Sequence, residues 1–291
     1  MAADDRVFSH FSTGGWAAGA REIYQKTAER DIAEVAYAVY FNPVHGTVSN
    51  PYFPMSPNFS PPQAVYIHVP FCAHRCGYCD FTLVAGKDHL IDGYLRALEI
   101  ELSRVEGTPE ISTLFFGGGT PTHLPPDALR RLFESVLPRY RLAAGYEFSV
   151  EANPAGLDKD KIAILADAGV NRVSLGIQSF DADVLTVLER DHRQAEIDAA
   201  LNGLRRRIDN IALDLIFAVP GQSLALWNAT LETAIAYAPQ HLSTYGLTFE
   251  KGTAFWTRRE KSQLIPATSE LEREMYALAI EKLPAAGFEH Y

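Results

Sequence analysis

The sequence predicts an α/β fold, in which a parallel sheet is flanked by helices, preceded by an N-terminal extension of different character. From residue 63 onward, six short apolar runs alternate with longer amphipathic segments. Strands that alternate with helices along a chain usually form a parallel sheet with the helices packed outside it. Six such units are enough for a partial (β/α)6 barrel of the TIM-like kind, and an open doubly wound sheet is the alternative.

The first 62 residues predict a separate extension. Apolar side chains recur at helical spacing over residues 15–41, which indicates an amphipathic helix. Six prolines then lie between residues 43 and 62, a density that excludes a helix or a central strand. We therefore predict an extended linker there, a domain boundary near residue 62 and an α/β domain over residues 63–291.

Within the α/β domain, each predicted strand is a short apolar run and each predicted helix has one apolar face. The strands are predicted over residues 65–69, 113–116, 147–150, 172–176, 211–217 and 242–248. The helices are predicted near residues 88–106, 126–137, 158–168, 193–207, 224–236 and 268–286.

Chemically distinctive residues follow or interrupt five of these strands. They are a cysteine loop after the first strand, Gly117–Gly119 after the second, Glu151 after the third, Gln178 after the fourth and Asp214 within the fifth. Asp214 interrupts an apolar run, and a buried carboxylate is costly unless it is paired or hydrogen-bonded. Ligands of parallel α/β folds bind where the strands end, so we expect these groups to meet at one rim.

The three cysteines of the chain lie together as Cys72, Cys76 and Cys79, with the spacing C-x3-C-x2-C. Three thiolates can hold an iron–sulfur cluster and leave one iron without a protein ligand. A structural zinc site or unrelated core cysteines are the alternatives. A disulfide framework is excluded, because the cysteines are few and odd in number.

Composition narrows the function further. The net charge of −10 argues against a broad nucleic-acid-binding face, although it leaves room for a local basic patch. Neither a dinucleotide-binding fingerprint nor a phosphate-binding P-loop is present. No apolar run is long enough for a membrane-spanning helix, and the acidic start lacks a signal core. We therefore expect a cytoplasmic protein with reduced cysteines.

Taken in order, these motifs resemble the radical S-adenosylmethionine (SAM) family. The cysteine loop, with Tyr78 before its last cysteine, matches the signature of that family. The segments 66–72, 115–122, 151–154, 176–180 and 214–217 are similar to the oxygen-independent coproporphyrinogen III oxidase group, including its HemW-like heme-chaperone branch. The resemblance covers about residues 64–291 and implies a partial (β/α)6 barrel.

The same resemblance implies cofactors and residue roles. Cys72, Cys76 and Cys79 would hold a [4Fe–4S] cluster whose open iron binds SAM, which one electron cleaves to methionine and a 5′-deoxyadenosyl radical. The residues implied in binding that SAM, or lining its site, are Tyr66, Tyr78, Gly118, Gly119, Thr120 and Glu151. Gln178, Arg190 and Asp214 match positions that bind a second SAM in the oxidase.

Two departures from the oxidase pattern bear on function. The oxidases carry a further cysteine two positions after the third, where this chain has Phe81. Family members also continue beyond the position of Tyr291, so the chain is expected to be truncated relative to them. The resemblance therefore implies a heme chaperone, with the porphyrinogen oxidase as the alternative and enzymatic turnover left open. The implied partners are heme or a porphyrinogen, an electron donor of the flavodoxin or ferredoxin type and a heme-accepting protein, without nucleic acid.

Overall fold

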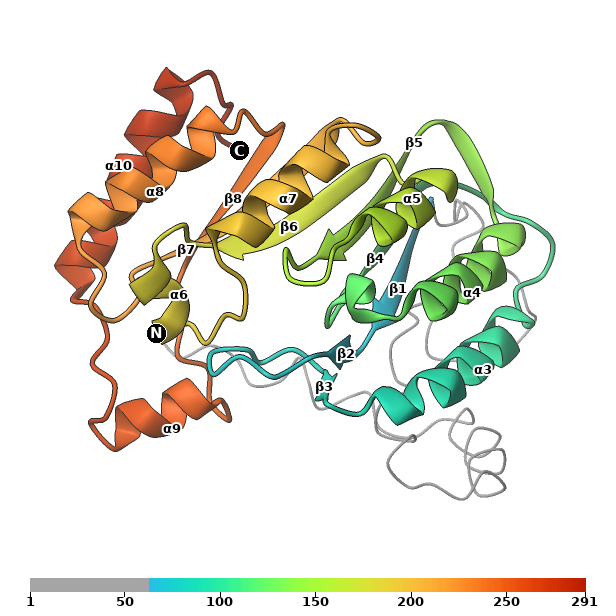
Figure 1. Ribbon diagram of the computed structural model, residues 1–291, viewed down its shortest axis with the longest axis horizontal. Coiled ribbons are helices and arrows are strands. Elements are labelled where there is room, and N and C mark those ends of the chain that lie inside the picture. Colours follow the sequence, from blue (N-terminus) through green and yellow to red (C-terminus); the bar gives the residue numbers. More distant parts are fainter. Residues whose placement is uncertain (1–62) are drawn as a thin grey trace, which may run out of the picture. The chain divides into compact units, whose positions relative to one another are not determined.

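A computed structural model describes residues 63–291, which form a six-stranded parallel sheet with helices packed on it (Figure 1). The strands of the sheet are β1 (Ala64–Val69), β4 (Glu110–Gly118), β5 (Arg141–Ala152), β6 (Arg172–Gln178), β7 (Asn210–Phe217) and β8 (His241–Gly246). Two further strands, β2 (Phe71–Cys72) and β3 (Val84–Ala85), form a small parallel ribbon of their own. The predicted helix and linker of residues 1–62 lie outside the described residues.

The helices follow the strands in regular alternation. They are α3 (Ile91–Leu102), α4 (Pro126–Val136), α5 (Lys159–Asp167), α6 (Ala182–Val187), α7 (Gln194–Leu204), α8 (Leu224–Ala236), α9 (Ala254–Glu260) and α10 (Ser269–Ala285). Short 3-10 turns, η1 (Asp88–Leu90), η2 (Pro121–His123) and η3 (Leu137–Arg139), lie beside α3 and α4. None of these helices combines the length and apolarity needed to cross a bilayer.

The order of the strands decides between the two predicted architectures. The sheet runs β1-β4-β5-β6-β7-β8, so each strand lies beside the next one along the chain and all neighbours are parallel. Right-handed crossovers that always advance in one direction place every crossover helix on the same face. The partial (β/α)6 barrel is therefore confirmed, and the doubly wound sheet, whose order reverses, is wrong.

The hydrophobic core lies between this sheet and the helices. Alternate strand residues, such as Ile67, Leu114 and Phe148, have no exposed surface because helices cover that face. The residues between them face the other side of the sheet, which we call the inner face. Polar side chains such as Ser149 and Ser174 occupy it. The inner face is therefore the part of the barrel that can receive a polar ligand.

Side-chain caps fix where several helices begin. An oxygen of the residue before the helix accepts a hydrogen bond from a backbone N–H of the first turn, which replaces a partner that the helix itself cannot supply. The capping residues are Asp158 for α5, Asp181 for α6, Ser223 for α8, Thr253 for α9 and Thr268 for α10. Two of these helices, α6 and α9, were not predicted from the periodicity, because they have only 6 and 7 residues.

Candidate metal and cofactor site

The cysteine loop connects β2 to β3 and is held in shape by its own hydrogen bonds. Arg75 donates from Nη1 to the carbonyl of Cys79 at 3.1 Å and from Nη2 to that of Leu83 at 2.8 Å. The N–H of Cys79 donates to the carbonyl of Cys76 at 3.0 Å, which closes a tight turn. The loop therefore has a defined conformation within the chain itself.

The loop reaches from the β1 edge of the sheet to the elements at the opposite edge (Figure 1). The N–H of Phe255, in α9, donates to the carbonyl of Gly77 at 2.8 Å. A Cβ atom on Gly77 would lie only 2.4 Å from the Phe255 ring and 2.9 Å from Oε2 of Glu189. Glycine at position 77 therefore lets the cysteine loop lie against α9 and against the turn that follows α6.

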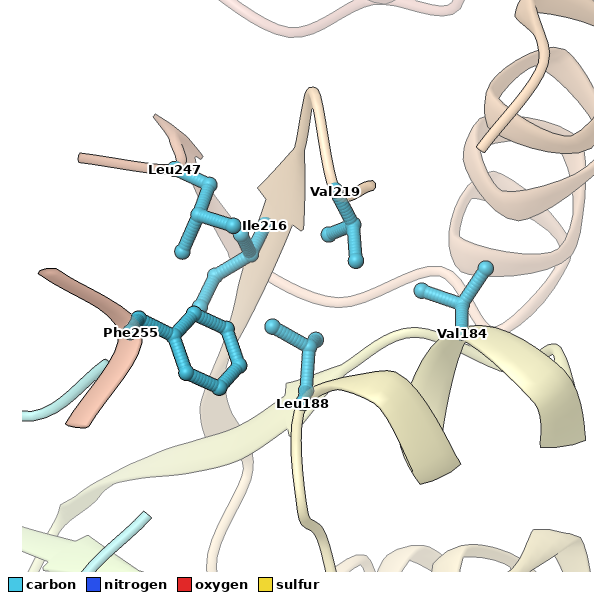
Figure 2. Close-up of a cluster of buried hydrophobic side chains, with 6 residues drawn as sticks. All are labelled: Val184, Leu188, Ile216, Val219, Leu247 and Phe255. Atoms are coloured by element: carbon cyan, nitrogen blue, oxygen red, sulfur yellow. The ribbon is translucent and has the colours of Figure 1, made fainter. Parts of the chain in front are cut away.

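Phe255 belongs to a buried apolar cluster that joins α6, the end of β7, the segment after β8 and α9 (Figure 2). Its members are Val184, Leu188, Ile216, Val219, Leu247 and Phe255. The Tyr78 ring of the cysteine loop packs against this cluster and meets Phe255 edge-on, with ring centroids 6.0 Å apart. The apolar cluster thus holds the cysteine loop through the aromatic contact between Tyr78 and Phe255.

The thiols of the loop lie among polar groups of the barrel rim. Cys72 Sγ is 3.4 Å from Oγ1 of Thr120, and Cys76 Sγ accepts from Nη1 of Arg190 at 3.7 Å. Nη2 of Arg190 donates to the carbonyl of Gly176 at 2.8 Å, which ties this cation to the end of β6. Burial raises the pKa of the Cys72 thiol, while the Arg190 guanidinium opposes that rise. A fixed cation therefore faces the cysteines, and all three are free of disulfides.

The glycine run 117–119 ends β4 and continues into the rim, instead of following the strand as a separate turn. Gly118 has a φ of +112°, and a Cβ there would lie 2.4 Å from the His68 ring. A Cβ on Gly117 would lie 2.8 Å from a Glu151 oxygen, and one on Gly119 would lie 2.7 Å from the Phe71 carbonyl oxygen. Backbone atoms beside Gly119 and the positive φ of Gly118 favour glycine at these two positions, whereas a side chain at position 117 would displace the Phe115 and Glu151 side chains.

Glu151 lies at the end of β5, directly against this run. Its Oε2 accepts from the N–H of Gly118 at 3.0 Å. Burial raises the pKa of the Glu151 carboxyl to about 7, with a smaller contribution from the negative charge of Asp214. The carboxylate is thus held at the rim in a place where a cationic ligand would stabilise its charged form.

Tyr66 and His68 form the neighbouring part of the rim on β1. The Tyr66 ring stacks on Phe115, and its hydroxyl lies 3.3 Å from Nδ1 of His68. Nε2 of His68 lies 2.7 Å from the Thr82 carbonyl oxygen, so both ring nitrogens have partners and the residue is a satisfied buried histidine. Burial raises the pKa of the Tyr66 hydroxyl to about 12, and the Glu151 charge adds to this rise. Tyr66 is therefore a neutral, oriented side chain at the rim.

Asp214 lies deeper on the inner face, in β7. Oγ of Ser174 donates to both of its carboxyl oxygens, at 3.2 and 3.0 Å, and Ser243 on β8 adds a side-chain hydrogen bond. Burial raises the pKa of the Asp214 carboxyl, and these two hydroxyls oppose the rise. The strand register places Gly176 and Ser243 on either side of Asp214, so the partners come from both neighbouring strands.

Gln178 and Arg190 converge on Gly176 from two different segments. Gln178 ends β6 with a φ of +67°, where the register with β7 shifts. A Cβ on Gly176 would lie 3.0 Å from the Gln178 amide nitrogen and 3.6 Å from Nη2 of Arg190. Arg190 and His192 lie in the segment between α6 and α7. His192 is fully buried and Arg190 is partly buried, and Nε2 of His192 lies 2.9 Å from the Ile177 carbonyl oxygen.

The predicted residues thus form three adjoining groups at one rim. The thiols lie with Thr120, Tyr78 and Arg190, whereas Glu151 lies with Tyr66 and the glycine run. Asp214 forms a third group with two serines that the sequence analysis missed, Ser174 and Ser243. Also missed were Glu189 and Phe255, which hold the cysteine loop through contacts that no local pattern indicates.

A mononuclear metal site finds no support in this geometry. Within residues 63–291, no three His, Cys, Asp or Glu side chains are arranged around a single ion.

Comparison with known proteins identifies the family. A model described as the radical SAM superfamily matches residues 66–234, which is more than half of the chain. The chain belongs to the radical SAM superfamily. The predicted resemblance to the coproporphyrinogen-oxidase-like group and its heme-chaperone branch is confirmed as well.

Two relatives and one solved structure illustrate the similarity. The heme chaperone HemW of Bacillus subtilis is 38% identical over 234 residues, which cover 79% of this chain and 62% of that protein. HemW of Escherichia coli is 37% identical over 239 residues, covering 79% and 61%. The structure of coproporphyrinogen III oxidase (HemN) from Escherichia coli, a radical SAM enzyme, matches with a TM-score of 0.71 and 28% identity. The match covers 79% of this chain and 54% of that one. The chain therefore spans about six tenths of the length of these curated relatives.

Membership in this superfamily implies a [4Fe–4S] cluster and SAM, and the residues present fit both. Three cysteines on one ordered loop supply the thiolates that such clusters use. Arg190 faces these thiolates, and its Nε is buried without a hydrogen-bond partner in residues 63–291. Next to them, Glu151 and Tyr66 offer acceptors to the polar end of an amino-acid cofactor.

Proposed function

We propose that Cys72, Cys76 and Cys79 hold the [4Fe–4S] cluster and that SAM binds beside them at the rim. The loop spacing, its anchoring by Phe255 and the Arg190 contact at Cys76 support this assignment. When bound, the cluster supplies the electron that cleaves the sulfonium of SAM. The chain binds and orients the cofactors and shields them from solvent, because the cofactors themselves carry the difficult chemistry.

The rim residues divide this work among them. Glu151, already oriented by the Gly118 N–H, would pair with the SAM ammonium group, and Tyr66 and Tyr78 would flank the cofactor. Gly119 and Thr120 would line the same region through their backbone groups. Gln178, Arg190 and Asp214 would form a second polar subsite further along the inner face, in the position of the second SAM of the oxidase.

We further infer that this site serves heme handling, as a heme chaperone. The observation that carries this inference is Phe81, two residues after Cys79, which replaces the extra cysteine of the oxidases. Its side chain is 59% exposed on the cysteine loop, where an apolar ring can meet a flat hydrophobic ligand but cannot bind iron. The curated relatives named as heme chaperones support the same inference.

A heme titration with a transfer step tests this function. The chain, purified and reconstituted without oxygen, should hold about four irons in its cluster, bind heme and release it to an apo-acceptor. Phe81→Ser should weaken heme binding without changing the iron of the cluster, whereas Tyr276→Ser, a change of another exposed aromatic ring on α10, should leave both unchanged. Failure of the full protein to bind heme would contradict the proposal.

The porphyrinogen oxidase is the second candidate. The similarity to the Escherichia coli oxidase structure and the presence of Gln178, Arg190 and Asp214 at the rim favour it. That reaction converts two propionate side chains to vinyl groups. Mass analysis of coproporphyrinogen incubations with SAM and a reductant decides the question, since products that have lost carbon dioxide and two hydrogen atoms once or twice require the oxidase.

The remaining partners follow from the same proposal. A reducible cluster needs an electron donor of the flavodoxin or ferredoxin type, and a chaperone needs a heme-accepting protein. Free cysteines and an oxygen-sensitive cluster persist in a reducing compartment, so we place the protein in the cytoplasm. Fractionation followed by immunodetection checks that placement.

A further inference from the structure

A basic patch lies on and beside α9, on a chain whose net charge is −10. Residues 250–261 carry four basic side chains and two acidic ones, Glu250 and Glu260. The basic side chains, which we call the α9 patch, are Lys251, Arg258, Arg259 and Lys261. Lys251, Arg258 and Lys261 are exposed, and the Arg259 side chain is one-third exposed. Arg258 pairs with Glu189 at 2.7 Å and Arg259 with Glu260 at 3.1 Å, so the two exposed lysines supply most of the positive charge that the patch presents to solvent.

The α9 patch adjoins the cysteine loop directly. Arg258 pairs with the Glu189 carboxylate at 2.7 Å. The carbonyl oxygen of Glu189 lies 2.5 Å from Nε2 of His74, inside the cysteine loop. The Arg258–Glu189 ion pair and the hydrogen bond from Phe255 to Gly77 therefore connect α9 to the cysteine loop. Figure 1 shows the loop extending from β2 and β3 toward α9.

Aromatic rings hold part of the patch in place. The Arg259 guanidinium lies 4.1 Å from the centroid of the Trp256 ring and 5.7 Å from that of Phe249. A cation fixed on aromatic faces loses little conformational freedom when it meets a partner. Arginine and aromatic residues are also enriched in protein interfaces and among their strongest contacts. The patch is therefore suited to binding a protein surface.

We propose that the α9 patch is the docking surface for an acidic one-electron donor protein. The proposal rests on the proposed function, because it assigns a partner to the cluster of the cysteine loop. The chain as a whole is acidic, so a local basic patch beside the cysteine loop orients an acidic partner toward the site of the cluster. In each productive encounter the donor loses one electron and the cluster gains one, which balances the step.

Charge reversal at the two lysines tests the docking surface. Lys251→Glu with Lys261→Glu changes four units of charge and leaves the Arg258–Glu189 pair intact. Arg104→Glu with Lys159→Glu, both exposed and far from α9 in the sequence, is the matched control. The full reconstituted protein is titrated with an oxidised flavodoxin at low ionic strength. The α9 variant should bind about tenfold more weakly, the control should bind like wild type, and added salt should close the gap.

Other results would overturn the assignment. These are unchanged binding by the α9 variant, equal weakening of both variants, or tighter binding of anionic vesicles than of flavodoxin by wild type. The proposed function is tested separately by the iron content of the wild-type protein and by its formation of 5′-deoxyadenosine with dithionite. Dithionite is a small reductant and needs no docking surface, so a failure in these two assays counts against the proposed function and not against the α9 patch. When the proposed function holds and the α9 patch is the docking surface, the α9 variant should cleave SAM normally with dithionite but more slowly with flavodoxin as the donor.

Discussion

Phe255→Ala should weaken the attachment of the cysteine loop. The Phe255 side chain is fully buried and contacts Gly77, Tyr78 and the rest of the apolar cluster. Truncation of a buried phenylalanine costs about 3–5 kcal/mol through lost apolar burial and the cavity left behind. The backbone hydrogen bond to Gly77 survives the change, so the loss falls on the packing beneath the loop. We expect lower folding stability and fewer irons retained per chain.

Phe133→Ala is the control for this experiment. Phe133 is 3% exposed and packs between α4 and the sheet, edge-on to Phe116 and Phe148. Its truncation should cost about as much stability by the same mechanism. Urea unfolding of the iron-free proteins measures stability, and iron and sulfide analysis after anaerobic reconstitution measures the cluster. Equal iron in both variants would refute the idea that Phe255 specifically supports the loop.

Three further changes test the rim and the start of α6. Gly118→Ala should lower the free energy of unfolding by about 1–3 kcal/mol, because the new Cβ would clash with the His68 ring and the φ of +112° disfavours alanine. Urea unfolding measures this loss, and an unchanged stability would contradict the close packing. Burial raises the pKa of Glu151 from 4.5 to about 7, so the wild-type protein loses stability as pH rises through that window. Glu151→Gln should remove this pH dependence, which changes the free energy of unfolding of the SAM-free protein by on the order of 3 kcal/mol. Parallel stability-against-pH profiles of wild type and variant would show that the carboxyl is solvated. Asp181→Ala should cost about 1 kcal/mol by uncapping α6, with normal iron content.

The sequence predicted the fold well where local patterns coincide with tertiary structure. The apolar runs of parallel strands are buried on the helix-facing side, so runs such as 211–217 are visible without any knowledge of contacts. The direction in which successive strands are added has no local signal. That is why the partial barrel and the doubly wound sheet could be separated only by the observed strand order.

The residues at the rim were predictable from the sequence, but the residues that hold them in place were not. Asp214 was recognisable because a carboxylate interrupts an apolar strand, yet Ser174 and Ser243 reach it only through strand register. The short helix α9 has no long periodic pattern and depends on the Thr253 cap and the burial of Phe255. Gly77 has no distinguishing signal in the sequence, although its missing side chain is what allows α9 to pack against the cysteine loop.

The central claim is that the three cysteines hold a cluster with one iron open to SAM. Electron paramagnetic resonance of the reduced, reconstituted protein, recorded with and without SAM, tests it most directly. We predict the signal of a single [4Fe–4S] cluster that changes on addition of SAM in wild type and is absent from the Cys76→Ser variant. A cluster signal that SAM leaves unchanged, or one that persists in Cys76→Ser, would contradict the account.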